Sequence, residues 1–159
     1  MNTLDMNSEH TNVQNQLCNV LVCGQTCQTK IKFALELWDG RLDVRYRNSE
    51  EDIVDLLNAQ PAHILLIDFD DVSIDPIKIL VFINGEQKSI ISIGVTESPP
   101  LDQIVDAAKL GVRTVVDVKS NVYQLQKEIR RAYEQWQNHI RGQNLFDFEK
   151  SDRNYNFVY

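Results

Sequence analysis

Four consecutive aliphatic residues, Ile64-Leu65-Leu66-Ile67, are followed directly by Asp68 near the middle of the chain. A continuous apolar run this short, placed between Pro61 and an acidic turn, indicates a β-strand that is buried on both faces. Such strands lie inside parallel sheets covered by helices, and ligands of such sheets bind beyond the carboxyl ends of the strands. The run therefore predicts an α/β fold with Asp68 at the functional edge of its sheet.

Segments typical of strands and of helices alternate five times along the chain. The predicted strands cover residues 19–23, 42–46, 63–68, 89–95 and 113–118, and the predicted helices cover residues 27–38, 50–59, 75–85, 101–110 and 122–141. Connections this short require a parallel sheet with helices on both faces. We therefore expect a five-stranded (βα)5 domain, flavodoxin-like or receiver-like, over residues 17–141. A disordered leader is expected at 1–16, and a linker or tail at 142–159 that leads towards a downstream output domain.

Residues that accept hydrogen bonds from free backbone N–H groups mark three helix starts. We expect Thr26 to cap the first helix, and Ser49 with Asp52 to form a variant capping box at the second. Asp75 followed by Pro76 is expected to start the third helix, because proline at the first helical position loses no hydrogen bond.

The net charge and the hydropathy pattern exclude several classes of protein. A charge of −7 at pH 7 argues against direct nucleic-acid binding, which needs a basic face. No apolar run approaches the roughly 18 residues of a membrane span, and residues 1–16 have no signal-peptide pattern. We therefore expect a cytoplasmic protein that meets other proteins and no membrane. In that compartment Cys18, Cys23 and Cys27 are expected to be thiols.

The second half of the chain carries an ordered set of motifs. Thr96 ends the fourth strand, Ala107-Ala108-Lys109-Leu110-Gly111-Val112 ends a helix, and Lys119 follows the fifth strand. Together with Asp68, this set resembles the receiver domain of bacterial response regulators over about Val20–Tyr133. The resemblance implies that Asp68 is the aspartate phosphorylated by a histidine kinase, with Thr96 and Lys119 as its partners.

The metal-binding part of the receiver pattern is missing. Receiver domains carry two acidic residues directly after the first strand to hold Mg²⁺, but here the segment Cys23-Gly24-Gln25-Thr26-Cys27 has no carboxylate. Mg²⁺ needs several hard oxygen ligands, and in phosphoryl transfer it neutralises the charge of the reacting groups. Asp70 and Asp71 are near in sequence but are expected on the rim of the loop.

Two further positions depart from the receiver pattern. By count, the family's lysine position falls on Val118, so Lys119 is one place late, and a shift of one residue along a strand reverses the side chain's face. The aromatic switch position of the fifth strand is occupied by Val115. We therefore expect a degenerate receiver, or pseudo-receiver. It would be a non-enzymatic signalling module without catalytic residues, metal or cofactor.

Several alternatives stay open at this point. An active receiver would be phosphorylated on Asp68. A flavodoxin-like ligand binder or enzyme would use the Gly24–Thr29 loop for a phosphate or a flavin. The three cysteines could form a redox or metal cluster, although their spacing matches no common zinc pattern. In the plainest interpretation, Asp68 accepts N–H bonds from the next loop, Thr96 caps a helix, and Lys119 is solvated. Three histidines are scattered and suggest no catalytic triad: His10, His63 and His139.

Apolar residues recur at spacings of three and four along the last predicted helix, in a seam typical of coiled coils. We expect these residues to form an interface with a dimer mate or a following domain: Val122, Leu125, Ile129, Ala132 and Trp136. The first part of this helix must also face the sheet, while the part beyond Tyr133 extends past the domain. The alternative is a solvated helix end. Residues 154–159 are similar to the linker before the ATPase domain of bacterial enhancer-binding activators, so a fused output domain of that type is one expected partner.

Overall fold

The structure, a computed structural model, describes residues 16–38, 41–86 and 89–149, without the side chains of Leu37 and residues 143–149. Residues 1–15 of the expected leader, including His10, and residues 150–159 of the expected tail lie outside this part. One parallel sheet contains five strands: β1 (Cys18–Cys23), β2 (Leu42–Arg47), β3 (Ile64–Asp68), β4 (Ile91–Thr96) and β5 (Thr114–Asp117). Their order is β2-β1-β3-β4-β5, which confirms the predicted parallel α/β fold.

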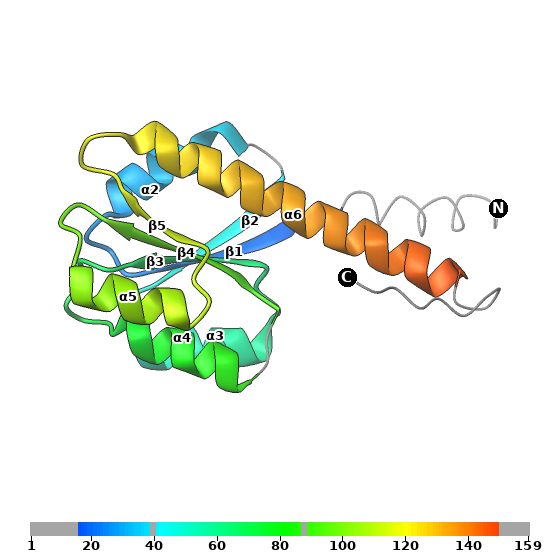
Figure 1. Cartoon of the computed structure of the whole chain (residues 1–159), viewed down its shortest axis with the longest axis horizontal. Coiled ribbons are helices and arrows are strands. Elements are labelled where there is room, and N and C mark those ends of the chain that lie inside the picture. Colours follow the sequence, from blue (N-terminus) through cyan, green and yellow to red (C-terminus); the bar gives the residue numbers. More distant parts are fainter. Residues whose placement is uncertain (1–15, 39–40, 87–88, 150–159) are drawn as a thin grey trace.

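Helices cover both faces of the sheet, as predicted (Figure 1). Helices α2 (Gln28–Leu35) and α6 (Val122–Glu149) lie on one face, and a short 3-10 turn, η1 (Glu36–Trp38), continues α2. Helices α3 (Glu50–Ala59), α4 (Pro76–Gly85) and α5 (Leu101–Lys109) lie on the other face. The helices are amphipathic or apolar because each must bury one side against the strands.

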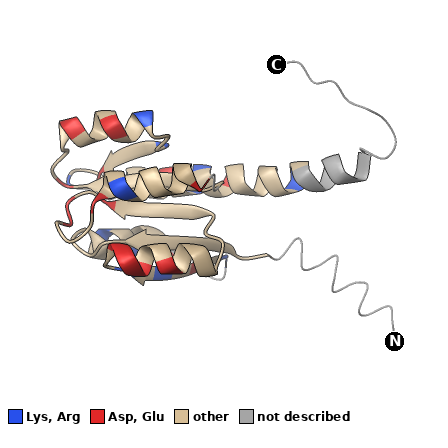
Figure 2. Cartoon of the chain, turned by 90° about the horizontal axis from the view of Figure 1, so that it is seen from below, with Lys and Arg blue, Asp and Glu red and all other residues tan. Residues whose placement is uncertain are grey.

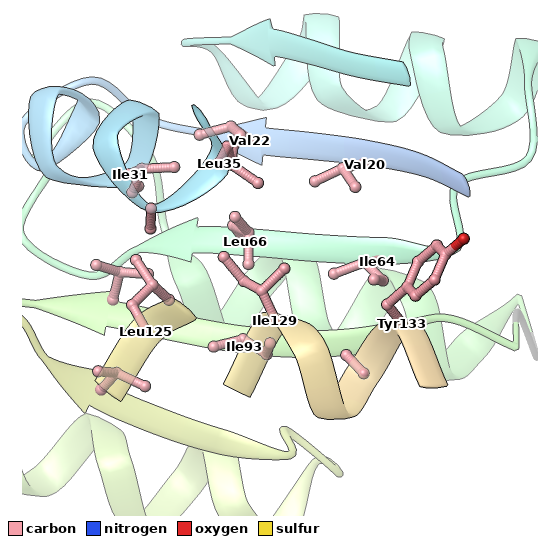
Figure 3. Close-up of a cluster of buried hydrophobic side chains, with 14 of the residues drawn as sticks. Val20, Val22, Ile31, Leu35, Ile64, Leu66, Ile93, Leu125, Ile129 and Tyr133 are labelled. Atoms are coloured by element: carbon pink, nitrogen blue, oxygen red, sulfur yellow. The ribbon is translucent and has the colours of Figure 1, made fainter. Parts of the chain in front are cut away.

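Each face of β3 supplies a separate core. Ile64 and Leu66 pack under α2 and α6, together with Leu125 and Ile129 (Figure 3). The alternate residues Leu65 and Ile67 pack under α3, α4 and α5. All four β3 side chains are fully buried, and burial of each such side chain stabilises the fold by about 1.5–3 kcal/mol. The uninterrupted apolar run therefore exists because neither face of β3 meets water.

The helix starts agree with the predicted caps at two of three places. The Ser49 hydroxyl accepts the Asp52 N–H, and the Asp75 carboxylate accepts the N–H of Ile77, with Pro76 in the first turn of α4. The prediction for Thr26 is wrong. Cys27 is the cap residue of α2 and makes no side-chain cap bond.

Helix α6 is longer than predicted. It continues to Glu149 instead of ending at Arg141, and its distal part extends beyond the sheet (Figure 1). No helix in the described part of the chain is long and apolar enough to cross a membrane.

The apolar seam of α6 has a different use from the one predicted. Leu125, Ile129 and Ala132 are fully buried and Trp136 is 7% exposed, and all four belong to the core beneath α6. Val122 is half-buried. The spacing marks the face that docks on the sheet, so the prediction of an intermolecular interface is wrong for the four buried residues and stays a prediction for Val122.

Candidate functional site

Asp68 ends β3 at the carboxyl edge of the sheet, where the buried run predicted it. Its side chain is 0% exposed. One carboxylate oxygen accepts the backbone N–H of Cys27 at 2.5 Å, and the other accepts the N–H of Asp70 at 2.9 Å. Burial raises the pKa of Asp68 because it penalises the charged form, although these hydrogen bonds oppose the shift. The interpretation of Asp68 as an acceptor of loop N–H groups is therefore confirmed.

Asp70 connects three loops at this edge. Its Oδ1 accepts the hydroxyl of Thr96 at 2.5 Å, and its Oδ2 accepts the N–H of Glu97 at 2.6 Å. The thiol of Cys27 also points to Oδ2, at 3.5 Å. Thr96 is almost fully buried, so its hydroxyl is committed to Asp70 and not to Asp68. Asp70 is half-buried, with its carboxylate turned towards Thr96 and Glu97, and the expectation of a place on the rim of the loop is wrong for the buried Asp71.

Asp71 is also turned inwards, with 5% of its surface exposed. Its Oδ2 accepts the N–H of Gln25 at 2.7 Å, and its Oδ1 accepts the N–H and the hydroxyl of Ser73 at 2.8 and 2.6 Å. Burial alone would raise the pKa of Asp71, but the bonds from Ser73 and Gln25 outweigh it and hold the pKa below its ordinary value. Asp71 therefore fixes the loop after β1 against the loop after β3.

Gly24 permits the close approach of these two loops. Its φ of +99° is one that other residues rarely adopt. A Cβ at this position would lie 2.7 Å from the Cβ of Asp68 and 3.2 Å from Oδ2 of Asp71. No side chain, and hence no carboxylate, fits at this point without moving the backbone.

A magnesium ion does not fit the residues that the structure gathers here. Within the described residues, Cys27, Asp68 and Asp70 are the one group whose ligand atoms lie within 4.8 Å of one another. Only two of these residues offer hard oxygen, and the third offers a thiol, whose pKa is raised by burial and by the neighbouring carboxylates. The carboxylate oxygens already accept backbone N–H groups, which would point at any cation beside them.

The three cysteines are free thiols and are buried, in agreement with the sequence prediction. Burial raises the pKa of Cys18 to about 12 and that of Cys23 further. Thiols in this state are poor nucleophiles and metal ligands, since the thiolate is the reactive form.

Comparison with solved structures identifies the fold of the chain that carries this site. The chain superposes on the signal receiver domain of a DNA-binding response regulator from Colwellia psychrerythraea with a TM-score of 0.64 and 21% identity, over 74% of this chain and 98% of that one. A CheY-like response regulator receiver domain from Methanospirillum hungatei gives 0.67 and 14%, over 78% and 99%. The BeF3-activated DrrB receiver domain gives 0.62 and 15%, over 75% and 99%. No protein-family model and no curated protein sequence matches the chain.

The chain has the receiver fold.

In this receiver fold, Lys119 does not reach the Asp68 site. Val118 occupies the lysine position expected by count and is buried in the core. Lys119 is exposed, and its side chain makes no hydrogen bond or ion pair with any described residue. The register argument made from the sequence therefore describes the structure correctly, and no bulge returns Lys119 to the site.

A different lysine lies at this edge of the receiver fold. Lys30 of α2 donates a hydrogen bond to the backbone oxygen of Val118 at 3.1 Å and forms an ion pair with Glu97. It therefore links α2 to the ends of β4 and β5. Sequence reasoning missed Lys30 because nothing in its local pattern distinguishes it from a solvated helix lysine.

An aromatic residue, Phe69, directly follows Asp68 and lies outside the predicted switch position of β5. Val115 occupies the predicted switch position, half-buried against the core. The ring of Phe69, which directly follows Asp68, packs over Gly94 so closely that a Cβ on Gly94 would lie 2.7 Å from it. This ring is 6% exposed and belongs to the core under α3, α4 and α5.

Proposed function

We propose that this protein is a receiver-type regulatory module of a signal-transduction system that works without Mg²⁺-dependent phosphorylation. It acts through contacts with another protein or with a fused output domain, and it is not an enzyme. The supporting observation is that the carboxylates at the Asp68 site are already satisfied by the protein's own hydrogen-bond donors.

The hydrogen bonds that the loop after β1 donates are the main support for this proposal. Its N–H groups at Gln25 and Cys27 bind Asp71 and Asp68, and Gly24 leaves no space for an acidic side chain. A loop that supplies hydrogen-bond donors to Asp68 cannot also supply the ligands that recruit a cation to it. The same use of the amides counts against a phosphate or flavin bound by the Gly24–Thr29 loop.

The hydrogen bonds of Asp70 give the module a fixed conformation. Thr96 and Glu97 are held by a carboxylate that belongs to the chain, where an active receiver would depend on a group added by a kinase. The contact surface near β4 and α5 is therefore present at all times. The signalling output of the module is then regulated by the amount of the partner protein or by its binding.

The charge distribution favours a protein partner over nucleic acid. The first turn of α3 carries Glu50, Glu51 and Asp52. Figure 2 shows acidic positions of the ribbon on short helices and in the loops beside one end of the sheet, with Lys and Arg positions dispersed among them. We place this module in the cytoplasm. We also expect it to form a homodimer, with an enhancer-binding-type ATPase as one candidate for the output domain.

Attempted phosphorylation tests the proposal. The full chain is incubated with Mg²⁺ and acetyl phosphate, and its intact mass is measured by mass spectrometry. We expect no phosphoryl adduct. In parallel, addition of BeF3⁻ with Mg²⁺ should leave the amide NMR signals of Asp68, Thr96 and Lys119 unchanged.

The DrrB receiver domain, which is described as BeF3-activated, serves as the positive control under identical conditions. A stable acyl-phosphate that is absent from the Asp68→Asn variant would overturn the proposal and favour the active-receiver alternative. A yellow purified protein would instead favour the flavodoxin-like alternative.

A further inference from the structure

A groove of about 520 Å³ lies at the amino end of the sheet, opposite to Asp68. It is lined by the residue before β3, by the start of β4 and by α6, which brings together His63, Ile91, Gln135, Trp136, Asn138 and His139. This volume falls within the range of about 300–1,000 Å³ that small-molecule pockets occupy. The receiver-type site at the other end uses none of these residues.

One side of the groove is an ordered aromatic surface. The ring of His63 stacks on that of Trp136, with centroids 5.0 Å apart and planes at 36°. Trp136 in turn contacts Tyr133 at 5.6 Å, and Tyr133 contacts Trp38 at 4.9 Å. Of these four rings, only His63 and Trp136 line the groove, and Trp136 is 7% exposed. Because Trp136 belongs to the core, this part of the lining is preformed and needs no ordering when a ligand binds.

Hydrogen bonding fixes the orientation of His63. Its Nδ1 accepts the backbone N–H of Asn19 at 2.9 Å, so the neutral ring carries its hydrogen on Nε2 and can donate it. Burial lowers the pKa of His63, which favours this neutral form. On α6, the side chains of Asn138 and His139 are exposed and bind no other described residue, so they are available as donors and acceptors.

The charges of the residues that line the groove indicate which class of ligand can bind there. None of the described residues that line the groove is Lys, Arg, Asp or Glu, so a phosphate, a carboxylate or an ammonium group would find no counter-charge among them. Arg113 touches Gln135 of the lining, but its guanidinium is paired with Glu128. Apolar and aromatic surface with a few amide and imidazole groups fits a flat ring that carries its own nitrogen acceptors and N–H donors. We propose that the groove binds a small, uncharged, planar heteroaromatic molecule such as a purine-type base.

A titration with adenine tests this assignment. We expect saturable shifts in the amide NMR signals of residues 63, 90–91 and 135–139, and no change at Asp68 or Thr96. Adenosine monophosphate carries the same ring with a charged phosphate and should bind no more tightly than adenine. The double variant Asn138→Ala/His139→Ala should lose the saturable shift, and so should Ser89→Trp, which fills the groove. Glu134→Ala, on an exposed position of α6 outside the groove, is the matched control and should retain it.

Three results would overturn the proposal. One is the absence of a saturable shift with adenine in the folded protein. Another is tighter binding of the phosphorylated ring, which would require a cation that is absent from the described lining residues. The third is a shift of the same residues when the protein alone is concentrated, because the occupant would then be a second copy of the chain. None of these results depends on whether Asp68 can be phosphorylated, so the two proposals fail separately.

Discussion

Asp70 is the side chain that joins the most loops at the carboxyl edge of the sheet. Its carboxylate holds Thr96, Glu97 and the Cys27 thiol, while Asp68 beside it is bound to backbone N–H groups. Asp68 and Asp70 therefore hold different parts of the structure, although they lie close together. Single substitutions at this edge of the sheet should show the role of each residue.

Substitution of Asp70 should loosen the loop after β4. In Asp70→Asn, one oxygen that accepts a hydrogen bond becomes an NH₂ group, so either Thr96 or Glu97 loses its partner. We expect a loss of about 1–3 kcal/mol in unfolding free energy and faster hydrogen exchange at the Glu97 amide. Asp106→Asn, at an exposed position of α5, is the control and should change stability by less than about 0.5 kcal/mol. Equal exchange rates in the two variants would contradict the assigned role.

Gly24 should be intolerant of any side chain. Gly24→Ala places a Cβ 2.7 Å from that of Asp68 at a φ of +99°, so we expect a loss of at least about 1–3 kcal/mol in urea denaturation. Gly85→Ala is the matched control because a Cβ there meets nothing within 4 Å and the residue lies in α4. That variant should be neutral or more stable by up to about 1 kcal/mol. A stable Gly24→Ala protein would show that the loops can separate.

Asp68 and Asp71 should have opposite effects on the pH dependence of stability. The pKa of Asp68 is raised from 3.8, so the stability linked to its protonation is complete below that pH and is lost as the pH rises. The pKa of Asp71 is lowered from 3.8, so its contribution is complete above that pH and is lost as the pH falls.

Denaturation of the two Asn variants between about pH 3 and pH 7 separates these effects. Relative to the unmodified protein, Asp68→Asn should gain unfolding free energy as the pH rises, and Asp71→Asn should lose it. The same slope for both variants would mean that the hydrogen bonds assigned to Asp71 are absent.

At the scale of elements, α6 is the helix that closes one core. Its apolar residues pack on β1, β3, β4 and β5 through a single face, and Glu128 on the same helix pairs with Arg113 and Arg131. Glu128 is 6% exposed, so this network lies at the boundary of the core. Removal of one buried side chain from this face should therefore cost far more than removal of an exposed one elsewhere.

Ile129→Ala should lower the unfolding free energy by about 2–5 kcal/mol, because Ile129 is fully buried between α6 and the sheet. Val105→Ala removes methyl groups from a residue of α5 that is 56% exposed, and it should be within about 0.5 kcal/mol of the unmodified protein. Chemical denaturation measures both. A small effect of Ile129→Ala would mean that α6 is not docked as described.

Sequence periodicity predicted the elements well because burial repeats along them. The strand Ile64–Ile67, the caps at Ser49 and Asp75, and the parallel direction of the strands all follow from patterns in the sequence that the structure preserves. The α6 seam was misassigned because a spacing of three and four indicates a buried face without saying whether the sheet or another molecule buries it.

The candidate site was harder to predict than the fold. Asp68 was found from its place after a buried strand, and the missing acids were visible in the sequence. The roles of Asp70, Asp71 and Lys30 depend on where the loops fold in space. The sequence Asp71-Val72-Ser73 did predict a local turn, because the aspartate side chain commonly accepts a hydrogen bond from the backbone N–H two residues later. This pattern does not predict the contact of Asp71 with the loop after β1.

At the scale of the whole molecule, the distal part of α6 is the feature that the compact domain does not explain. The helix is 28 residues long and extends past the sheet (Figure 1). A helix segment with no packing partner is marginally stable in water. We propose that this segment takes part in the dimer contact or in the connection with an output domain.

The mass in solution tests the dimer. We expect the full chain to sediment as a dimer and the chain truncated after Arg141 to sediment as a monomer with unchanged unfolding free energy. A cut before Trp136 would be uninformative because it removes part of the core. Monomers in both cases would exclude the distal helix as the dimer contact.

Both tryptophans of the chain, Trp38 and Trp136, sit in one line of stacked rings with Tyr133 and His63, remote from Asp68. The tryptophan fluorescence of this protein therefore reports on a single region of the molecule. The emission should change when α6 is displaced or when a ligand binds beside His63. It should stay the same when the surroundings of Asp68, Asp70 and Asp71 change. Tryptophan emission alone would therefore follow changes at the amino end of the sheet and would not detect changes near Asp68.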